Sequence, residues 1–150
     1  IRESPLASVE RLYDKLKEKV FPYISIQSQL SVSQGFELFI KHQEKKIAST
    51  ALIHGDFGAS NILWDSIKGE ITGVIDFGGS GPGDPAYDFA GLLSSYGEEF
   101  FNQCIDLYPE GQQIKDRVNF YRSTFALQEA LHGIENNDDM ALKNGIRNYI

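Results

Sequence analysis

The sequence predicts an α+β fold that is mostly helical and carries one small β-hairpin. Apolar residues recur at helical spacing through most of the chain, and two of these stretches begin with a capping residue followed by proline. Near the middle, two short apolar runs, 62–64 and 71–75, flank a polar turn that contains Gly69. A chain of 150 residues is long enough to bury a core, and we expect a single domain.

Two helices are expected before residue 50. Ser4 followed by Pro5 is a typical helix start, and apolar residues at helical spacing extend this helix over 5–20, until Pro22 ends it. A second helix is expected over 33–48. Its centre is apolar and its last part carries lysines, which interact favourably with the negative end of the helix dipole.

Two apolar runs, 62–64 and 71–75, are expected to be short strands that pair as the hairpin, and a further short apolar run, 50–53, leads into the segment that begins at His54. Trp64 is expected to pack in the core. Residues 77–83 contain four glycines and are expected to lack regular structure.

The remaining chain is predicted to be helical. Asp84 is followed by proline and is expected to act only as the cap of a helix. Another helix is expected from Gly97 onward until Pro109 stops it. A longer helix is expected over about 111–133 and a last one over about 138–149.

Composition limits the classes of partner. No apolar run approaches the ~20 residues that span a bilayer, so we expect no membrane partner. A net charge of −7 disfavours nucleic acid and suits a cationic small molecule; the alternative is that the charge only keeps the protein soluble. Cys104 is the single cysteine, which excludes an internal disulfide, and a reducing cytoplasm is the simplest location.

Three polar residues have the spacing of a kinase catalytic loop. Asp56 in the sequence His54-Gly55-Asp56 precedes Asn61 by five positions, and Asp76 follows fifteen residues later. Phosphoryl transfer needs an acid anion that orients and deprotonates the attacking hydroxyl, and oxygen ligands for magnesium. We therefore predict Asp56 as the base and Asn61 and Asp76 as metal ligands. The alternatives are a turn or capping role for Asp56 and a strand-end position before a glycine turn for Asp76.

The predicted hairpin gives this motif a geometric consequence. Asn61 lies just before its first strand, and Asp76 lies just after its second. Both residues should therefore lie at the open end of the hairpin and face one site.

Three segments together resemble the aminoglycoside phosphotransferases: 54–63, 75–78 and 83–90. These antibiotic kinases have a protein-kinase-like fold and are grouped with choline kinases and other small-molecule kinases. The resemblance is close over about residues 50–95, and residues 96–100 most resemble the 2''-phosphotransferases. It implies the C-terminal lobe of such a kinase, which uses ATP or GTP with Mg2+ to phosphorylate a cationic small molecule.

The resemblance also implies roles for further residues. Leu63 and Ile75 match positions that pack against the nucleotide base, and His54 and Asp88 match positions that brace the catalytic loop. Acidic residues in the later helices are candidate contacts for the amines of a substrate, or alternatively helix-dipole partners. These are Glu98, Glu99, Asp138 and Asp139.

The motifs that clamp the nucleotide phosphates are not found in these 150 residues, which contain no glycine-rich loop followed by a strand lysine. We therefore expect the N-terminal nucleotide lobe upstream of Ile1, and we expect residues 1–150 alone to hold substrate without phosphorylating it. A macrolide, choline or homoserine kinase of the same superfamily remains an alternative.

Overall fold

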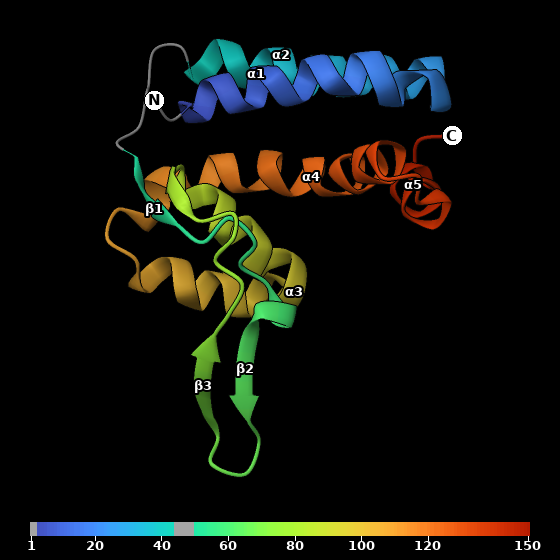
Figure 1. Cartoon of the computed structure of the whole chain (residues 1–150). Helices are drawn as coiled ribbons and strands as arrows, with labels where there is room; N and C mark the ends of the chain where they lie inside the picture. The colour runs from blue at the N-terminus through green and yellow to red at the C-terminus, as the bar shows by residue number, and fades with distance from the viewer. Residues whose placement is uncertain (1–2, 44–49) are drawn as a thin grey trace. The chain divides into compact units, whose positions relative to one another are not determined.

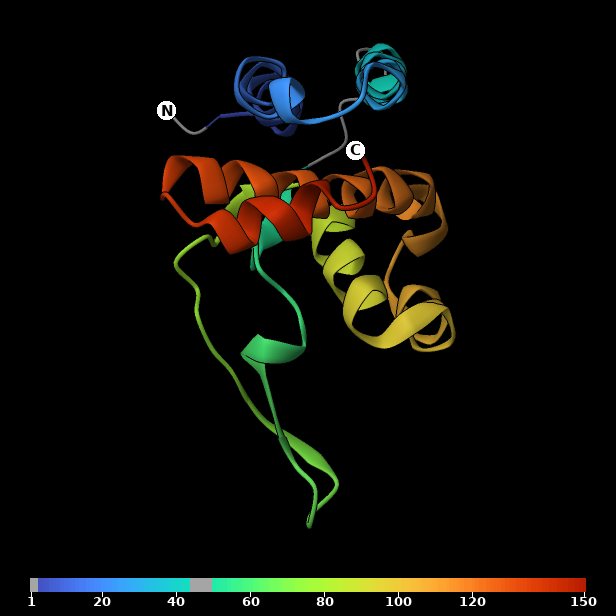
Figure 2. The same ribbon diagram turned by 90° about the vertical axis from the view of Figure 1, so that its right-hand side faces the viewer.

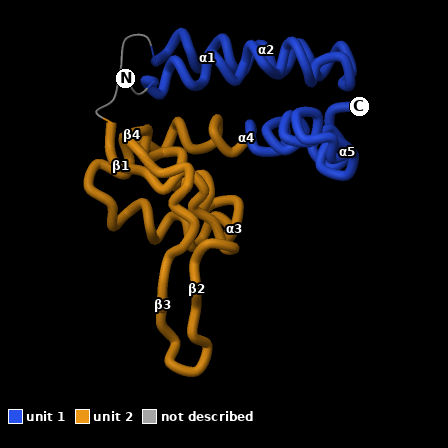
Figure 3. Tube along the Cα trace, in the orientation of Figure 1, with its two compact units in different colours: residues 1–47, 123–150 blue, residues 48–122 orange. Residues whose placement is uncertain are grey.

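The computed structural model describes residues 3–43 and 50–150 (Figure 1). The chain divides into two compact units: Ile1–Ile47 with Ser123–Ile150, and Ala48–Arg122 (Figure 3). The boundary between the units falls within helix α4. Each unit has its own apolar core and is described separately.

In the first unit, α1 (Pro5–Lys15) begins as predicted, because the Ser4 hydroxyl accepts a hydrogen bond from the Ala7 N–H at 3.1 Å. The helical path continues as a π-helical turn over Leu16–Val20 and a 3-10 turn over Phe21–Tyr23. The predicted helix over 5–20 is therefore confirmed, with its last turn widened and its end at the proline.

Helix α2 (Ile26–Gln43) starts at Ile26 and not at residue 33, so the predicted start was wrong. Ser25 caps the helix, since its hydroxyl accepts the Ser28 N–H at 3.2 Å. This capping serine, which follows the buried Ile24, is the signal that the apolar pattern alone missed. The predicted end, residues 44–48, lies outside the described residues.

Helix α2 packs on α1 through an aromatic contact. The rings of Tyr13 and Phe36 stack with centroids 4.9 Å apart, and the Tyr13 hydroxyl donates to Glu37 Oε1 at 3.1 Å. Helix α5 (Asp139–Ile146) lies alongside the C-terminal part of α4 (Gly111–Glu135) (Figures 1 and 2). Both helices confirm the elements predicted there.

The second unit contains a two-stranded antiparallel sheet formed by β1 (Ala51–Ile53) and β4 (Gly81–Gly83). The expectation that 77–83 lacks regular structure was therefore wrong for its last three residues. Gly83 is buried against Ile53, and a Cβ at Gly83 would lie 2.5 Å from Ile53 Cδ1. Gly83 was expected to lie in irregular structure, but its lack of a side chain is what lets Ile53 pack directly on the strand.

Strands β2 (Ile62–Asp65) and β3 (Glu70–Val74) form the predicted hairpin, with a bulge between Leu63 and Trp64. The turn contains Gly69 at φ +65°, which glycine adopts without strain. Trp64 is 61% exposed, so its predicted core position was wrong. Its cross-strand partner Ile71 is 60% exposed as well, because a two-stranded ribbon has no second layer of its own to cover this face.

Helix α3 (Pro85–Leu107) begins at the predicted cap and is interrupted at Gly97, whose φ of 84° and ψ of 177° are not helical. The apolar core of this unit is formed by α3 and the first half of α4. Its buried members include Phe89, Leu93, Phe101, Ile105 and Val118. None of the helices in the described part of the chain combines the length and the hydropathy that crossing a bilayer requires.

Candidate active site

The segment after β1, which we call the loop 54–61, turns sharply at Gly55. This residue has a φ of +89°, and a Cβ there would lie 2.5 Å from the Gly79 carbonyl oxygen. A side chain at position 55 would therefore meet both backbone strain and a collision. The turn brings the loop against the segment that follows Asp76.

His54 connects the loop to the end of β3 and is 7% exposed. Its Nδ1 accepts a hydrogen bond from the Asp56 N–H at 3.1 Å, so this nitrogen carries no proton. Nε2 then carries the proton and donates to the Ile75 carbonyl oxygen at 2.8 Å. One imidazole thus links the residue predicted as the base to the residue preceding Asp76.

Asp88 holds the first part of the loop from helix α3. Its Oδ2 accepts the His54 N–H at 2.7 Å, and its Oδ1 accepts the Gly55 N–H at 3.0 Å. A carboxylate that accepts two backbone N–H groups satisfies donors that the turn leaves without partners.

Asp56 and Asn61 are in direct contact. The buried Asn61 amide donates through Nδ2 to the Asp56 carbonyl oxygen at 2.9 Å and to Asp56 Oδ2 at 3.1 Å. The Asp56 side chain is exposed, and its Oδ1 accepts no hydrogen bond from the described residues. The arrangement orients the carboxylate while leaving one of its oxygens open.

Asp76 reaches the same end of the hairpin. The Ile75 N–H donates to the Asn61 carbonyl oxygen at 2.9 Å, which places Asp76 one residue beyond the contact. Asp76 has a φ of +62°, in the left-handed region that non-glycine residues seldom adopt and where aspartate is enriched among them. Backbone of this kind concentrates at functional sites.

The oxygens at this point fit the chemistry of magnesium. Asn61 uses Nδ2 for hydrogen bonds, which leaves its Oδ1 as the atom that could bind a metal ion. The exposed Asp76 carboxylate accepts no hydrogen bond from the described residues. Within residues 3–43 and 50–150, no group of three or more His, Cys, Asp or Glu side chains could hold a metal ion. Two protein oxygens suit Mg2+, which commonly keeps waters and binds substrate phosphates.

Leu63 and Ile75 lie on one face of the hairpin. Leu63 is paired with Gly73, and side chains two residues apart on a strand share a face, so Ile75 continues the face of Leu63. The two side chains are 43% and 44% exposed. An apolar surface is therefore open beside Asn61 and Asp76.

The four acidic residues of the later helices belong to two different units. Glu98 and Glu99 are exposed on α3 directly after Gly97, in the second unit. Asp138 and Asp139 belong to the first unit. Asp138 caps α5, since its Oδ1 accepts the N–H groups of Met140 and Ala141 at 3.1 Å each, a capping role that was not predicted for it.

Sequence reasoning missed a buried cluster around Asp84. Besides accepting the Ala86 N–H at 3.0 Å, Asp84 receives Arg117 Nε at 2.7 Å and Nη2 at 2.9 Å, and the Tyr121 hydroxyl at 2.9 Å. The hydrogen bonds to Asp84 raise the pKa of Arg117, against the opposing effect of burial. The expectation that Asp84 is only a cap was wrong, because its carboxylate also binds Arg117 and Tyr121. Both partners lie on α4, far along the sequence, so no local pattern could predict them.

Residues 3–133 match the model of the phosphotransferase enzyme family. The chain belongs to this family. Viomycin phosphotransferase of Streptomyces vinaceus is 36% identical to it over 104 residues, which are 67% of this chain and 36% of the relative. The predicted resemblance is thereby confirmed at the level of the family.

Solved structures of phosphotransferases share the fold. The GDP and kanamycin complex of APH(2'')-IIIa superposes with a TM-score of 0.85 at 23% identity, over 97% of this chain and 50% of that chain. Macrolide 2'-phosphotransferase type I gives 0.68 at 18% identity, over 98% and 49%. The fold class is thus confirmed as the C-terminal lobe of a protein-kinase-like fold, and the chain spans about half the length of these structures.

Proposed function

We propose that these residues form the catalytic-loop part of a kinase that transfers the γ-phosphate of ATP or GTP to a hydroxyl of a cationic small molecule, first of all an aminoglycoside antibiotic. One observation carries the proposal. Asn61 holds Asp56 through its amide and receives the Ile75 N–H on its carbonyl, beside Asp76. This contact supports an open carboxylate and two proposed oxygen ligands for a metal at the same end of the hairpin, which are the groups that phosphoryl transfer requires.

Asp56 is proposed as the base. Its Oδ2 is held by Asn61 Nδ2, while Oδ1 stays open for the hydrogen of the acceptor hydroxyl. A carboxylate in this position aligns the attacking oxygen and takes its proton as the bond to phosphorus forms. The protein forms no covalent bond to the transferred phosphoryl group in such a reaction, so alignment of the hydroxyl with the phosphate accounts for much of the rate.

Asn61 and Asp76 are proposed to hold magnesium through Asn61 Oδ1 and the Asp76 carboxylate. When bound, the metal neutralises charge on the phosphate oxygens. Leu63 and Ile75 offer the nucleotide base an apolar surface beside these ligands. His54 and Asp88 fix the loop 54–61 to the end of β3 and to α3. This attachment keeps the proposed catalytic base Asp56 in a constant position relative to the proposed metal ligands.

The proposed acceptor is cationic because the chain carries a net charge of −7 and exposes Glu98 and Glu99 on the second unit. Carboxylates pair well with the ammonium groups of such a substrate. The relative that is 36% identical is named for viomycin, which makes this antibiotic the second candidate acceptor.

The test is Asp56→Asn in the intact gene product, assayed with ATP and GTP against a panel of aminoglycosides and viomycin. We expect kcat to fall by about three orders of magnitude with nucleotide affinity unchanged, because only the proton acceptor is removed. Asp116→Asn, an exposed carboxylate on α4, is the matched control and should turn over normally. Near-normal turnover by Asp56→Asn would show that the base is misassigned.

We propose that residues 1–150 alone bind the substrate without phosphorylating it, because the motifs that clamp the nucleotide phosphates are not among these residues. The same assay on purified residues 1–150 decides this point. Phosphorylation of any acceptor by that segment would overturn the proposal about the segment and leave the role of Asp56 intact.

A further inference from the structure

One face of helix α3 contacts the loop 54–61 at more points than Asp88. Asp88, Gly91 and Ser95 are spaced three and four residues apart, which places them on one face of the helix. Ser95 Oγ accepts the Ala59 N–H at 3.0 Å. A Cβ at Gly91 would lie 2.2 Å from the Phe57 carbonyl oxygen, so the loop backbone passes directly over this glycine.

We propose that Gly91 and Ser95 are positioning residues for phosphoryl transfer. They hold residues 57–59 against α3 as Asp88 holds 54–55, so that Asp56 is fixed between two attachment points. This inference rests on the proposed function of Asp56, and it concerns residues other than the proposed base and metal ligands.

The exposure of Asp56 makes the second attachment necessary. The Asp56 carboxylate receives only Asn61 Nδ2 from the described residues, so its direction depends on the backbone on either side. Before Asp56, Asp88 restrains two N–H groups. After it, the Gly58 N–H donates to the Asp56 carbonyl at 3.1 Å, and the next N–H belongs to Ala59, held by Ser95. A displacement of about 1 Å at a reacting group can cost about a hundredfold in rate.

Glycine on both sides explains how the loop approaches so closely. A helix interior disfavours glycine relative to alanine, so Gly91 needs a packing reason, and the Phe57 carbonyl supplies it. Reciprocally, a Cβ at Gly58 would lie 2.9 Å from Ser95 Oγ. The contact therefore depends on the absence of a side chain at 58 and 91 and on a hydroxyl at 95.

Turnover by the intact gene product tests the hydroxyl. Ser95→Ala should lower kcat about five- to tenfold while KM for nucleotide and acceptor stays within about twofold, because one hydrogen bond that orients the loop is lost and no substrate contact changes. Ser95→Thr, which keeps the hydroxyl, should recover most of kcat. Ser94→Ala removes an exposed hydroxyl from the neighbouring position and should match the wild type.

The glycine is tested by a larger change. Gly91→Ala should lower kcat about a hundredfold, since the added methyl displaces the loop at Phe57. Gly35→Ala is the matched control, because a Cβ at that helical glycine on α2 would meet no atom of the described residues within 4 Å beyond its own stretch of helix. Equal kcat in Gly91→Ala and Gly35→Ala would overturn the assignment of Gly91.

Hydrogen exchange separates this inference from the proposed function. The Ala59 amide should exchange faster in Ser95→Ala than in the wild type or Ser94→Ala, whether or not any substrate is phosphorylated. Faster exchange in a protein without kinase activity would refute the proposed function and keep the attachment. Equal exchange and equal kcat in Ser95→Ala and Ser94→Ala would refute the attachment.

Discussion

The two strands of the β1–β4 sheet lead into two aspartates with opposite surroundings. After β4, Asp84 is 7% exposed, and its oxygens receive Arg117, Tyr121 and the Ala86 N–H. After β1, Asp56 is exposed and receives only the Asn61 amide from the described residues. A carboxylate whose oxygens are filled by protein donors stabilises the fold, whereas one with an open oxygen is available for chemistry.

The largest effect is expected when the buried carboxylate loses its partner. Arg117→Met should lower the free energy of unfolding by about 3–5 kcal/mol, because it leaves a buried charge without compensation. Urea denaturation followed by circular dichroism measures this. Arg122→Met, an exposed arginine on the same helix, should change it by less than about 0.5 kcal/mol. If Arg117→Met lowered the free energy of unfolding by less than about 1 kcal/mol, Asp84 would not stabilise the fold in the way that distinguishes it from Asp56.

The open end of the hairpin should show the reverse behaviour. Asp76→Asn in the intact gene product should lower kcat about 10²–10³-fold and raise the Mg2+ concentration needed for half-maximal activity, because a charged ligand becomes neutral. Stability should stay within about 0.5 kcal/mol, since the side chain is exposed and asparagine tolerates a φ of +62°. A stability loss as large as that of Arg117→Met would mean that Asp76 serves the fold.

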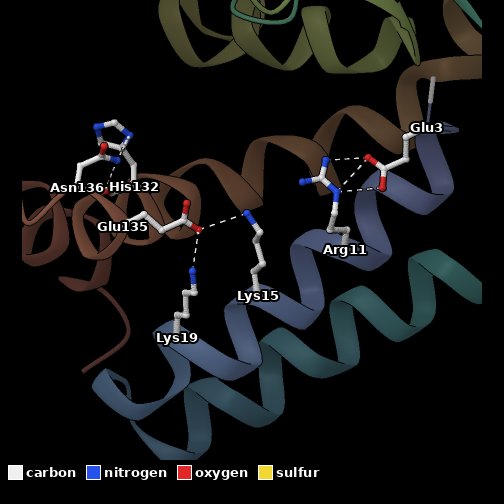
Figure 4. Close-up of polar contacts among 7 residues, drawn as sticks. All are labelled: Glu3, Arg11, Lys15, Lys19, His132, Glu135 and Asn136. Atoms are coloured by element: carbon white, nitrogen blue, oxygen red, sulfur yellow. Dashed lines mark hydrogen bonds and ion pairs between the residues drawn. The ribbon is translucent and has the colours of Figure 1, made fainter. Parts of the chain in front are cut away.

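The smallest effect is expected for an exposed ion pair with the same shortest distance between nitrogen and oxygen. Glu3 and Arg11 meet at 2.7 Å, the distance between Asp84 and Arg117, yet both side chains face solvent (Figure 4). The hydrogen bond from Arg11 holds the pKa of Glu3 below its ordinary value of 4.5. Because the folded-state pKa is the lower one, the contribution is present above pH 4.5 and is lost as the pH falls through the folded-state value.

Thermal melts of Glu3→Gln check this sign. At pH 7 and low salt, the variant should melt slightly below the wild type, and the difference should shrink at high salt and as the pH falls below 4.5. Glu135→Gln, which removes the contacts with Lys15 and Lys19 at 3.4 Å, should behave in the same way (Figure 4). A difference that grows at pH 3 would contradict the direction of the pKa shift.

Local signals account for the elements that were predicted well. The hairpin followed from a glycine turn between two apolar runs, and α1 and α3 followed from a cap and a proline. The failures have non-local causes. Strand β4 depends on Ile53, distant in sequence, and Trp64 is exposed because the hairpin provides no layer over it. The start of α2 was present in the sequence at Ser25 and was missed.

The sequence by itself determined the family and the candidate groups, because Asp56, Asn61 and Asp76 have a spacing that short-range geometry turns into the candidate site. Only the tertiary structure decided which groups hold that site. Arg117 meets Asp84 across 33 positions, and Ser95 meets Ala59 across 36. The first pair forms because α4 packs against the start of α3, and the second because α3 packs against the loop 54–61. Packing is a property of the whole chain, so no local pattern of residues encodes it.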